Sequence, residues 1–172
     1  MSADTPTAGS APATEEQAEH DRQWMTCALV EADRAAAAGD VPVGACVVAG
    51  GRLVAAAGNR TLADCDPTAH AEVVVLRAAA RQLANHRTGG TLYVTLEPCI
   101  LCMGALVQAR VERLVFGAAD PKAGAAVSLY RLAEDERLNH RFAVDGGVLA
   151  DECAERLTRF FAARRRSRVR DA

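Results

Sequence analysis

Segments with strand and helix patterns alternate along most of this sequence, and the alternation restricts the fold more than any other feature. Short apolar runs bounded by turn residues are typical of buried strands, whereas apolar residues recurring every three to four positions are typical of helices. The sequence predicts helices at residues 15–38, 70–84, 99–109 and 150–168, and strands at 41–48, 52–57, 91–95 and 112–116. A helix, a hairpin and then alternating strands and helices predict an α/β fold, with one mixed sheet covered by helices on both faces.

The remaining segments give weaker patterns. Residues 127–133 are expected to form a short helix, and residues 141–148 a short strand or an extended segment. In the last helix, the residues expected on the apolar side are Leu157, Phe160 and Phe161. These segments are expected to complete the fold without adding a second domain.

Length and charge limit the classes of protein to consider. The 172 residues suit one domain, expected at 15–168 after a disordered tail at 1–14. The formal net charge is only -2, so the chain as a whole has no basic character that would indicate nucleic-acid binding. The stretch from Arg159 to Arg170, however, holds six arginines and no acidic residue. It indicates either a solvated helix end favoured by the helix dipole or a surface that binds phosphate.

The six cysteines indicate metal binding rather than disulfides. The first twenty residues lack the apolar segment of a secretory signal and the arginines of an organellar transit peptide. No apolar run is long enough to span a membrane, so no membrane partner is expected. We therefore expect a cytoplasmic protein, in which closely spaced cysteines bind metal more often than they pair.

Two short motifs carry candidate chemistry. Cys99 and Cys102 follow Pro98 at the start of a predicted helix, where residues three apart lie on one side and exposed N–H groups favour thiolates. Alone, this pair fits a metal site, a redox site or two buried thiols. His70 and Glu72 stand two residues apart, so on a helix they would not readily bind one ion together. Alone, this second motif is more typical of an ordinary histidine and a first-turn glutamate.

Together the motifs favour a catalytic zinc site. His70, Cys99 and Cys102 supply three ligands of the types that zinc prefers, and three protein ligands leave a fourth position for water. Glu72 would then be free to take a proton from that water as a general base. A structural site closed by a fourth protein ligand stays open as an alternative, with three candidates: Cys65, His86 and His140.

The combination of H-x-E and P-C-x-x-C is the established signature of zinc-dependent nucleobase deaminases. Beyond this signature, the sequence resembles the bacterial tRNA-specific adenosine deaminases, a family within the cytidine and deoxycytidylate deaminase superfamily. The resemblance extends from about Trp24 to Arg166, which is most of the chain. The segments that carry it are residues 41–45, 58–60, 66–72, 91–99, 115–118, 124–126, 139–141 and 147–153.

The resemblance implies a three-layer α/β/α sandwich with a five-stranded mixed sheet, and a homodimer with one Zn²⁺ per subunit. The implied reaction is hydrolytic deamination of adenosine to inosine at wobble position 34 of a tRNA anticodon, so the expected partner is an anticodon stem-loop. Position by position, His70, Cys99 and Cys102 match the zinc ligands, and Glu72 matches the catalytic proton shuttle. The resemblance also favours RNA contact for the arginine-rich end of the chain.

Three further positions match residues that bind substrate nucleotides. Asn59 would hydrogen-bond the flipped nucleotide, and Ala71 would offer its backbone to the base. Asp120 would contact the sugar of a nucleotide beside the target. Without the resemblance, Asn59 and Asp120 are ordinary turn residues.

Three alternative functions remain beside this prediction. A deaminase of free guanine, free cytosine or a nucleoside would share the zinc, Glu72 and the fold, but would not need Asp120, Lys122 or the arginine-rich end. A non-catalytic subunit or zinc-stabilised RNA-binding module could lose the proton shuttle, so the presence of Glu72 speaks against it. A thiol redox protein using Cys99 and Cys102 would leave His70 and Glu72 unexplained.

Overall fold

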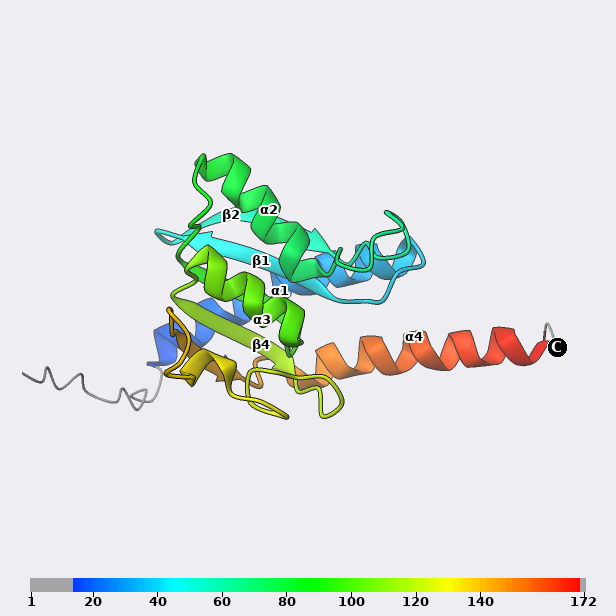
Figure 1. Cartoon of the computed structure of the whole chain (residues 1–172). Helices are drawn as coiled ribbons and strands as arrows, with labels where there is room; N and C mark the ends of the chain where they lie inside the picture. The colour runs from blue at the N-terminus through cyan, green and yellow to red at the C-terminus, as the bar shows by residue number, and fades with distance from the viewer. Residues whose placement is uncertain (1–13, 171–172) are drawn as a thin grey trace, which may run out of the picture.

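A five-stranded mixed sheet forms the middle layer of the protein, whose computed structural model describes residues 14–170 (Figure 1). The strands are β1 (Gly44–Ala49), β2 (Arg52–Gly58), β3 (Thr91–Leu96), β4 (Arg113–Ala118) and β5 (Ala143–Gly146), in the order β2-β1-β3-β4-β5. β1 is antiparallel to both β2 and β3, whereas the pairs β3–β4 and β4–β5 are parallel. The mixed sheet expected from the sequence is confirmed.

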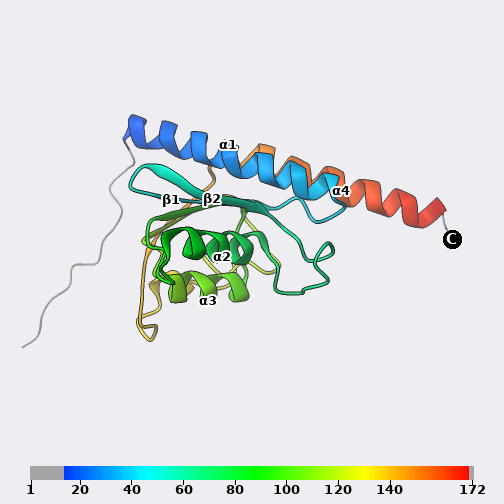
Figure 2. The same cartoon turned by 90° about the horizontal axis from the view of Figure 1, so that it is seen from above.

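Two pairs of helices cover the two faces of this sheet. The helices are α1 (Glu15–Ala37), α2 (Ala71–Leu83), α3 (Ile100–Ala109) and α4 (Ala150–Arg170). Figure 2 shows α1 and α4 on one face and α2 and α3 on the other. One apolar core lies between the sheet and α2 and α3, and a second lies between the sheet and α1 and α4. The three-layer α/β/α sandwich is therefore confirmed.

Local sequence explains where α1 and the hairpin begin and end. The hydroxyl of Thr14 accepts a hydrogen bond from the Gln17 N–H at 3.2 Å and so caps the start of α1. Gly50 and Gly51, at φ values of 57° and 70°, form the tight turn between β1 and β2.

None of the helices in the described part of the chain has both the length and the apolarity needed to cross a bilayer.

β1 begins at Gly44, so the prediction of a strand from residue 41 is wrong at its start. The Val43 N–H donates to the Val41 carbonyl at 2.7 Å, which bends the chain around Pro42. Proline has no N–H to offer a neighbouring strand, so the bend replaces ladder pairing here. As a result Val41 and Val43 line a pocket instead of extending the sheet.

The short helix expected at residues 127–133 is also absent, and the structure has only a 3-10 turn at Leu132–Glu134. The N–H groups of Val127 and Ser128 donate to the carboxylate of Glu97 at 2.8 and 2.9 Å. The chain therefore wraps around a side chain that lies far away in sequence, and no helix starts at residue 127. β5 falls within the expected segment 141–148.

α4 continues two residues beyond the predicted end, and its second half extends away from the rest of the protein (Figures 1 and 2). Leu157 packs against the apolar core and Phe160 is half-buried. Phe161, also expected on the apolar side of this helix, is 43% exposed. The helix has left the sheet at this point and has no core to face. Of the tail expected at 1–14, only Thr14 lies within the described residues.

Candidate metal centre and substrate pocket

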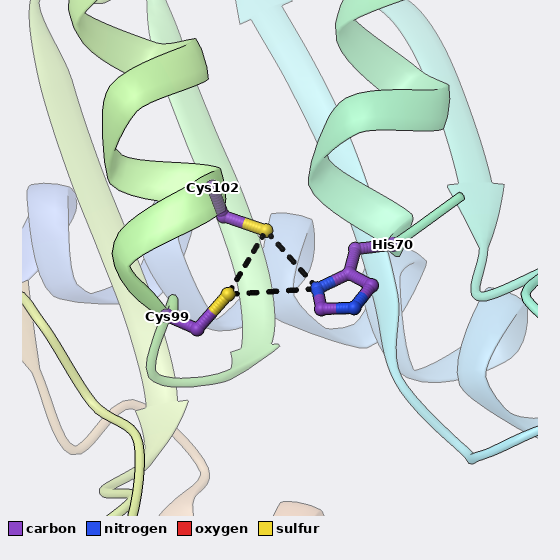
Figure 3. Close-up of side chains that lie close together, drawn as sticks. All are labelled: His70, Cys99 and Cys102. Carbon is purple, nitrogen blue, oxygen red and sulfur yellow. Dashed lines mark hydrogen bonds between the residues drawn. The ribbon is translucent and has the colours of Figure 1, made fainter. Parts of the chain in front are cut away.

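The starts of α2 and α3 bring the predicted ligands together. His70 is the N-cap of α2 and Cys99 is the N-cap of α3, both with extended backbone, and Cys102 lies in the first turn of α3. Because α2 and α3 lie side by side on one face of the sheet, their first turns are neighbours. Figure 3 shows the three side chains pointing toward one another from these two helix starts.

The distances between the three side chains fit one zinc ion. The Nδ1 atom of His70 lies 3.6 Å from the Cys99 sulfur and 3.4 Å from the Cys102 sulfur, and the sulfurs lie 3.8 Å apart. Tetrahedral zinc with ordinary Zn–S and Zn–N bond lengths requires separations of about 3.8 Å between two sulfurs and about 3.6 Å between sulfur and nitrogen. The separations between the donor atoms therefore already match those of tetrahedral zinc coordination.

The electrostatics of the two sulfurs favour metal binding as well. The hydrogen bond shared with Cys102 lowers the pKa of the Cys99 thiol to about 3, with help from His70 and against the effect of burial. The same shared hydrogen bond, together with burial, raises the pKa of Cys102. One thiolate thus forms readily at neutral pH, and a divalent cation would stabilise the second.

None of the three candidates for a fourth protein ligand reaches this group. Among the described residues, the cluster that could hold a metal ion comprises His70, Cys99 and Cys102. Cys65 and His86 are exposed, and the His140 ring nitrogen Nε2 lies 2.6 Å from the Val111 carbonyl. Three ligands with an open fourth position are typical of a catalytic rather than a structural zinc site.

A cavity of about 240 Å³ opens beside these ligands. Its lining includes His70, Cys99 and Glu72. Glu72 is the second residue of α2 and only 4% exposed, and this burial raises the pKa of its carboxyl group. The structure therefore brings the predicted proton shuttle into the same cavity as two of the three predicted ligands.

Asn59 lies in one wall of the cavity, directly after β2. Its side-chain amide donates to the carboxylate of Asp40 at 2.7 Å and to the Thr61 hydroxyl at 3.1 Å. Asp40 is fully buried and also accepts the backbone N–H groups of Leu62 and Ala63. Burial would raise the pKa of Asp40, but the hydrogen bonds from Ala63, Asn59 and Thr61 outweigh it and lower the pKa.

Asp120 also lines this cavity. Its carboxylate accepts the backbone N–H groups of Lys122 and Ala123 at 2.9 and 3.2 Å, so it also closes a turn. Its own N–H donates to Glu97 at 3.0 Å. Ala71 is buried at the first position of α2, where an N–H has no acceptor within its own helix.

Sequence reasoning missed two residues of this site, Asp40 and Glu97. Both are buried carboxylates whose hydrogen-bond donors come mostly from a distant segment of the chain. Asp40 follows the glycine that ends α1, and Glu97 stands immediately before the P-C-x-x-C motif. Neither place carries a recognisable signal, apart from the presence of Glu97 in a segment that resembles the deaminases.

Comparison with known proteins agrees with the arrangement of the site. The family described as the cytidine and deoxycytidylate deaminase zinc-binding region matches residues 18–118. This chain belongs to that deaminase family. Among its deaminase relatives, the tRNA-specific adenosine deaminase of Haemophilus influenzae is 46% identical over 151 residues, which cover 87% of each chain.

Solved deaminase structures share the fold. One comes from studies of A-to-I editing by tRNA:A34 deaminases at the wobble position of transfer RNA. It has a TM-score of 0.76 and 45% identity to this chain, and the match covers 78% of this chain and 99% of the other. A guanine deaminase from Bacillus subtilis has a TM-score of 0.55 and 33% identity, over 56% of this chain and 63% of its own. The likeness to the tRNA deaminase structure is thus both closer and more extensive.

Proposed function

We propose that this protein is a zinc-dependent tRNA adenosine deaminase, a hydrolase that converts adenosine to inosine at wobble position 34 of a tRNA anticodon. The observation that carries the proposal is the cavity that holds His70, Cys99 and the buried Glu72 in a chain 46% identical to a tRNA-specific adenosine deaminase. The catalytic unit is the domain at residues 15–168. Its substrate contact is the anticodon stem-loop.

His70, Cys99 and Cys102 would hold one Zn²⁺ per subunit. When bound, the ion would supply a water molecule that loses its proton near neutral pH. The charges suit this role, because two thiolates balance the dication and the imidazole stays neutral. The His70 side chain would hold the ion through Nδ1, the ring nitrogen that faces both sulfurs.

Glu72 would carry the protons of the reaction. It accepts a proton from the attacking water and delivers protons to the adenine ring nitrogen and to the departing amino group. One water is consumed and one ammonia is released, and a C6–O bond replaces the C6–N bond. Burial raises the pKa of Glu72, a shift in the direction that suits a carboxyl group acting in turn as base and acid.

The remaining site residues would hold the flipped nucleotide. Asn59 hydrogen-bonds the base from one wall, the first N–H of α2 at Ala71 meets it at the metal end, and Asp120 contacts the sugar of a neighbouring nucleotide. Supporting this assignment, Asn59 and Asp120 both line the cavity that contains Glu72. Taking the nucleotide out of its stack gives its reacting carbon access to such a pocket.

A homodimer in the cytoplasm completes the proposal. Exposed apolar residues gather around the start of α3 and the segment that follows Gly124: Ile100, Leu101, Val127, Leu129 and Tyr130. Gly124 pairs with Cys99, so these two groups of residues are neighbours beside the metal centre. An apolar surface of this kind suits a second copy of the chain.

The deciding experiment compares substrates directly. The purified protein is incubated with an anticodon stem-loop that carries a wobble adenosine and, in parallel, with guanine, cytosine and cytidine. We expect inosine and ammonia from the stem-loop alone, with loss of activity when a chelator removes zinc. Ammonia from a free base, with none from the RNA, would reject the RNA substrate and favour the small-molecule branch.

Glu72→Gln tests the assignment of the proton shuttle. The variant should keep one zinc per chain and lose activity by at least the factor of about 10² to 10⁴ typical of general acid–base catalysis. Metal analysis and inosine formation are measured on the same sample. An active variant would contradict the mechanism.

A further inference from the structure

Glu97 occupies a special place between the sheet and the metal centre. It directly follows β3, and its backbone N–H donates to the Ala118 carbonyl at 2.8 Å, next to the end of β4. Pro98 and the ligand Cys99 come immediately after it. Glu97 is only 2% exposed although it bears a carboxylate. A buried carboxylate needs strong compensation, so its hydrogen-bond partners matter.

All of its side-chain partners come from one irregular segment, residues 120–128. The Oε1 atom accepts the N–H groups of Ala126, Val127 and Ser128 at 3.2, 2.8 and 2.9 Å. The Oε2 atom accepts the Asp120 N–H at 3.0 Å and the Ser128 hydroxyl. Four N–H groups and one hydroxyl use the full acceptor capacity of a carboxylate, so each donor has its position set by Glu97.

The segment is also fitted closely around the carboxylate. A Cβ atom added at Gly124 would lie 2.3 Å from the Glu97 Oε2 atom, so only glycine lets the chain pass here. Gly124 pairs with Cys99, and the Ala125 N–H donates to the Pro98 carbonyl at 2.8 Å. Residues 120–128 are therefore fastened to the backbone that carries a metal ligand.

This same segment forms one wall of the substrate pocket. Asp120 and Ala123 line the cavity beside Glu97. Between β4 and the 3-10 turn at Leu132, the described chain forms no helix and no strand, apart from the single bridge at Gly124. The segment's own backbone hydrogen bonds are turn contacts, such as the bond from the Gly124 N–H to the Asp120 carbonyl at 2.8 Å. The Glu97 carboxylate accepts four further N–H groups of the segment, so it sets much of the shape of this wall.

We propose that Glu97 is a positioning residue for substrate binding, which fixes the wall that carries Asp120 at a set distance from the metal centre. The inference rests on the proposed function, because it assigns Asp120 to the nucleotide beside the target. Glu97 itself does not touch the reacting atoms. Its loss should therefore weaken substrate binding more than it slows the chemical step.

Glu97→Gln is the direct test. The amide keeps the shape of the side chain but turns an N–H group toward donors that need an acceptor. We expect KM for the stem-loop to rise at least tenfold, kcat to change less than threefold and zinc content to stay at one per chain. We also expect the amides of residues 120–128 to exchange with deuterium at least ten times faster. Ser128→Ala removes one of the five donors and should shift KM in the same direction by about threefold, even if Glu97→Gln folds poorly.

Asp21→Asn is the matched control. Asp21 is another buried carboxylate with several donors, but it lies on α1, on the opposite face of the sheet from α2 and α3. This control should lower the melting temperature and leave KM unchanged. A second readout is a double-mutant cycle of Glu97→Gln with Asp120→Ala. If Glu97 acts through Asp120, the double variant should have a KM little higher than that of either single variant.

The proposal fails if KM and loop exchange are unchanged in Glu97→Gln, or if its effect multiplies with that of Asp120→Ala. It also fails if zinc is lost together with activity, since Glu97 would then support the metal ligand instead of the wall. If the wild-type protein does not deaminate the stem-loop, the proposed function is rejected on its own. The exchange rates then still decide whether Glu97 holds the wall.

Discussion

A buried ion pair joins α1 to the sheet and should be a major source of stability. Arg113 on β4 donates two hydrogen bonds to Asp21 on α1, at 2.8 and 2.7 Å, and one to Asp145 on β5, at 2.7 Å. The Asp21 side chain is 5% exposed, and that of Arg113 is 19% exposed. Asp21 also accepts hydrogen bonds from Tyr93 at 2.8 Å and Gln17 at 3.0 Å.

Arg113→Met retains most of the apolar part of the side chain and removes its charge. Removing one partner of a buried pair costs about 3–5 kcal/mol, because the other charge is left without compensation. We expect the lower end, about 3 kcal/mol, since Tyr93 and Gln17 still donate to Asp21. Asp145 is 37% exposed, so water replaces much of the stabilisation that Arg113 gave it. Domains of this size have a free energy of unfolding of about 5–15 kcal/mol, so the variant should lose a substantial part of it.

The loss of stability should also depend on pH. Burial would raise the pKa of Asp21, but the hydrogen bonds from Arg113, Tyr93 and Gln17 outweigh burial and lower it. In the wild type, this carboxylate therefore stabilises the fold above its unfolded pKa of about 3.9, and the stabilisation is lost as the pH falls through the folded pKa. In the variant, the Arg113 hydrogen bonds no longer oppose the effect of burial on Asp21, so the pKa of Asp21 in the folded protein rises. Protonation of Asp21 in acid then removes the cost of burying its unpaired charge. The difference in stability between the two proteins should shrink in acid.

Urea unfolding at neutral pH and at about pH 4.5 measures this difference. The control is Arg156→Met, because Arg156 forms a similar pair with Asp33, at 2.8 and 3.1 Å. Those side chains are 24% and 51% exposed, so the control should lose less than about 1 kcal/mol. Equal losses in the two variants, or a gap that does not narrow in acid, would refute the reasoning.

Two further predictions concern the substrate. Asp40→Asn should raise KM for the stem-loop about tenfold, which corresponds to a loss of about 1.4 kcal/mol of binding free energy. The reason is that the new side-chain amide at position 40 no longer anchors Asn59 as the carboxylate did. The zinc content should not change. Kinetics and metal analysis check both statements, and an unchanged KM would exclude this role for Asp40. Removal of the chain after Ala163 should weaken tRNA binding and make it less sensitive to salt. The slope of log affinity against log salt concentration should fall in magnitude by about 0.7–0.9 for each phosphate that the arginines no longer neutralise. Binding isotherms at several salt concentrations test this, and an unchanged affinity would count against RNA binding by the arginine-rich end.

The sequence predicted the metal centre because its parts depend on short-range geometry. Cys99 and Cys102 stand three residues apart at a helix start, and His70 precedes another helix, so the motif already fixes where each side chain begins. The alternation of strand and helix patterns predicted that both helices would lie on one sheet. The resemblance to the deaminases then added Asn59 and Asp120, which a pattern of polar turn residues does not distinguish from ordinary loops.

The missing helix at residues 127–133 and the missed role of Asp40 have a common physical cause, namely hydrogen bonds between distant parts of the chain. Residues 127–133 have a composition suited to a helix, but Glu97, thirty residues before Val127, accepts their first N–H groups. Every residue type except proline has the same backbone N–H group, so no sequence pattern predicts that a loop will close around a carboxylate. The role of Asp40, whose donors lie around residues 59–63, was missed for the same reason.

The site therefore divides its tasks between two kinds of structure. The residues that would bind metal and carry protons sit at the starts of regular helices, whose backbone hydrogen bonds hold them independently of the substrate. The residues that would contact nucleotides sit on irregular segments, each held by one buried carboxylate. Asp40 holds Asn59, and Glu97 holds residues 120–128. Substitutions in those segments can change which nucleobase fits without moving the metal ligands.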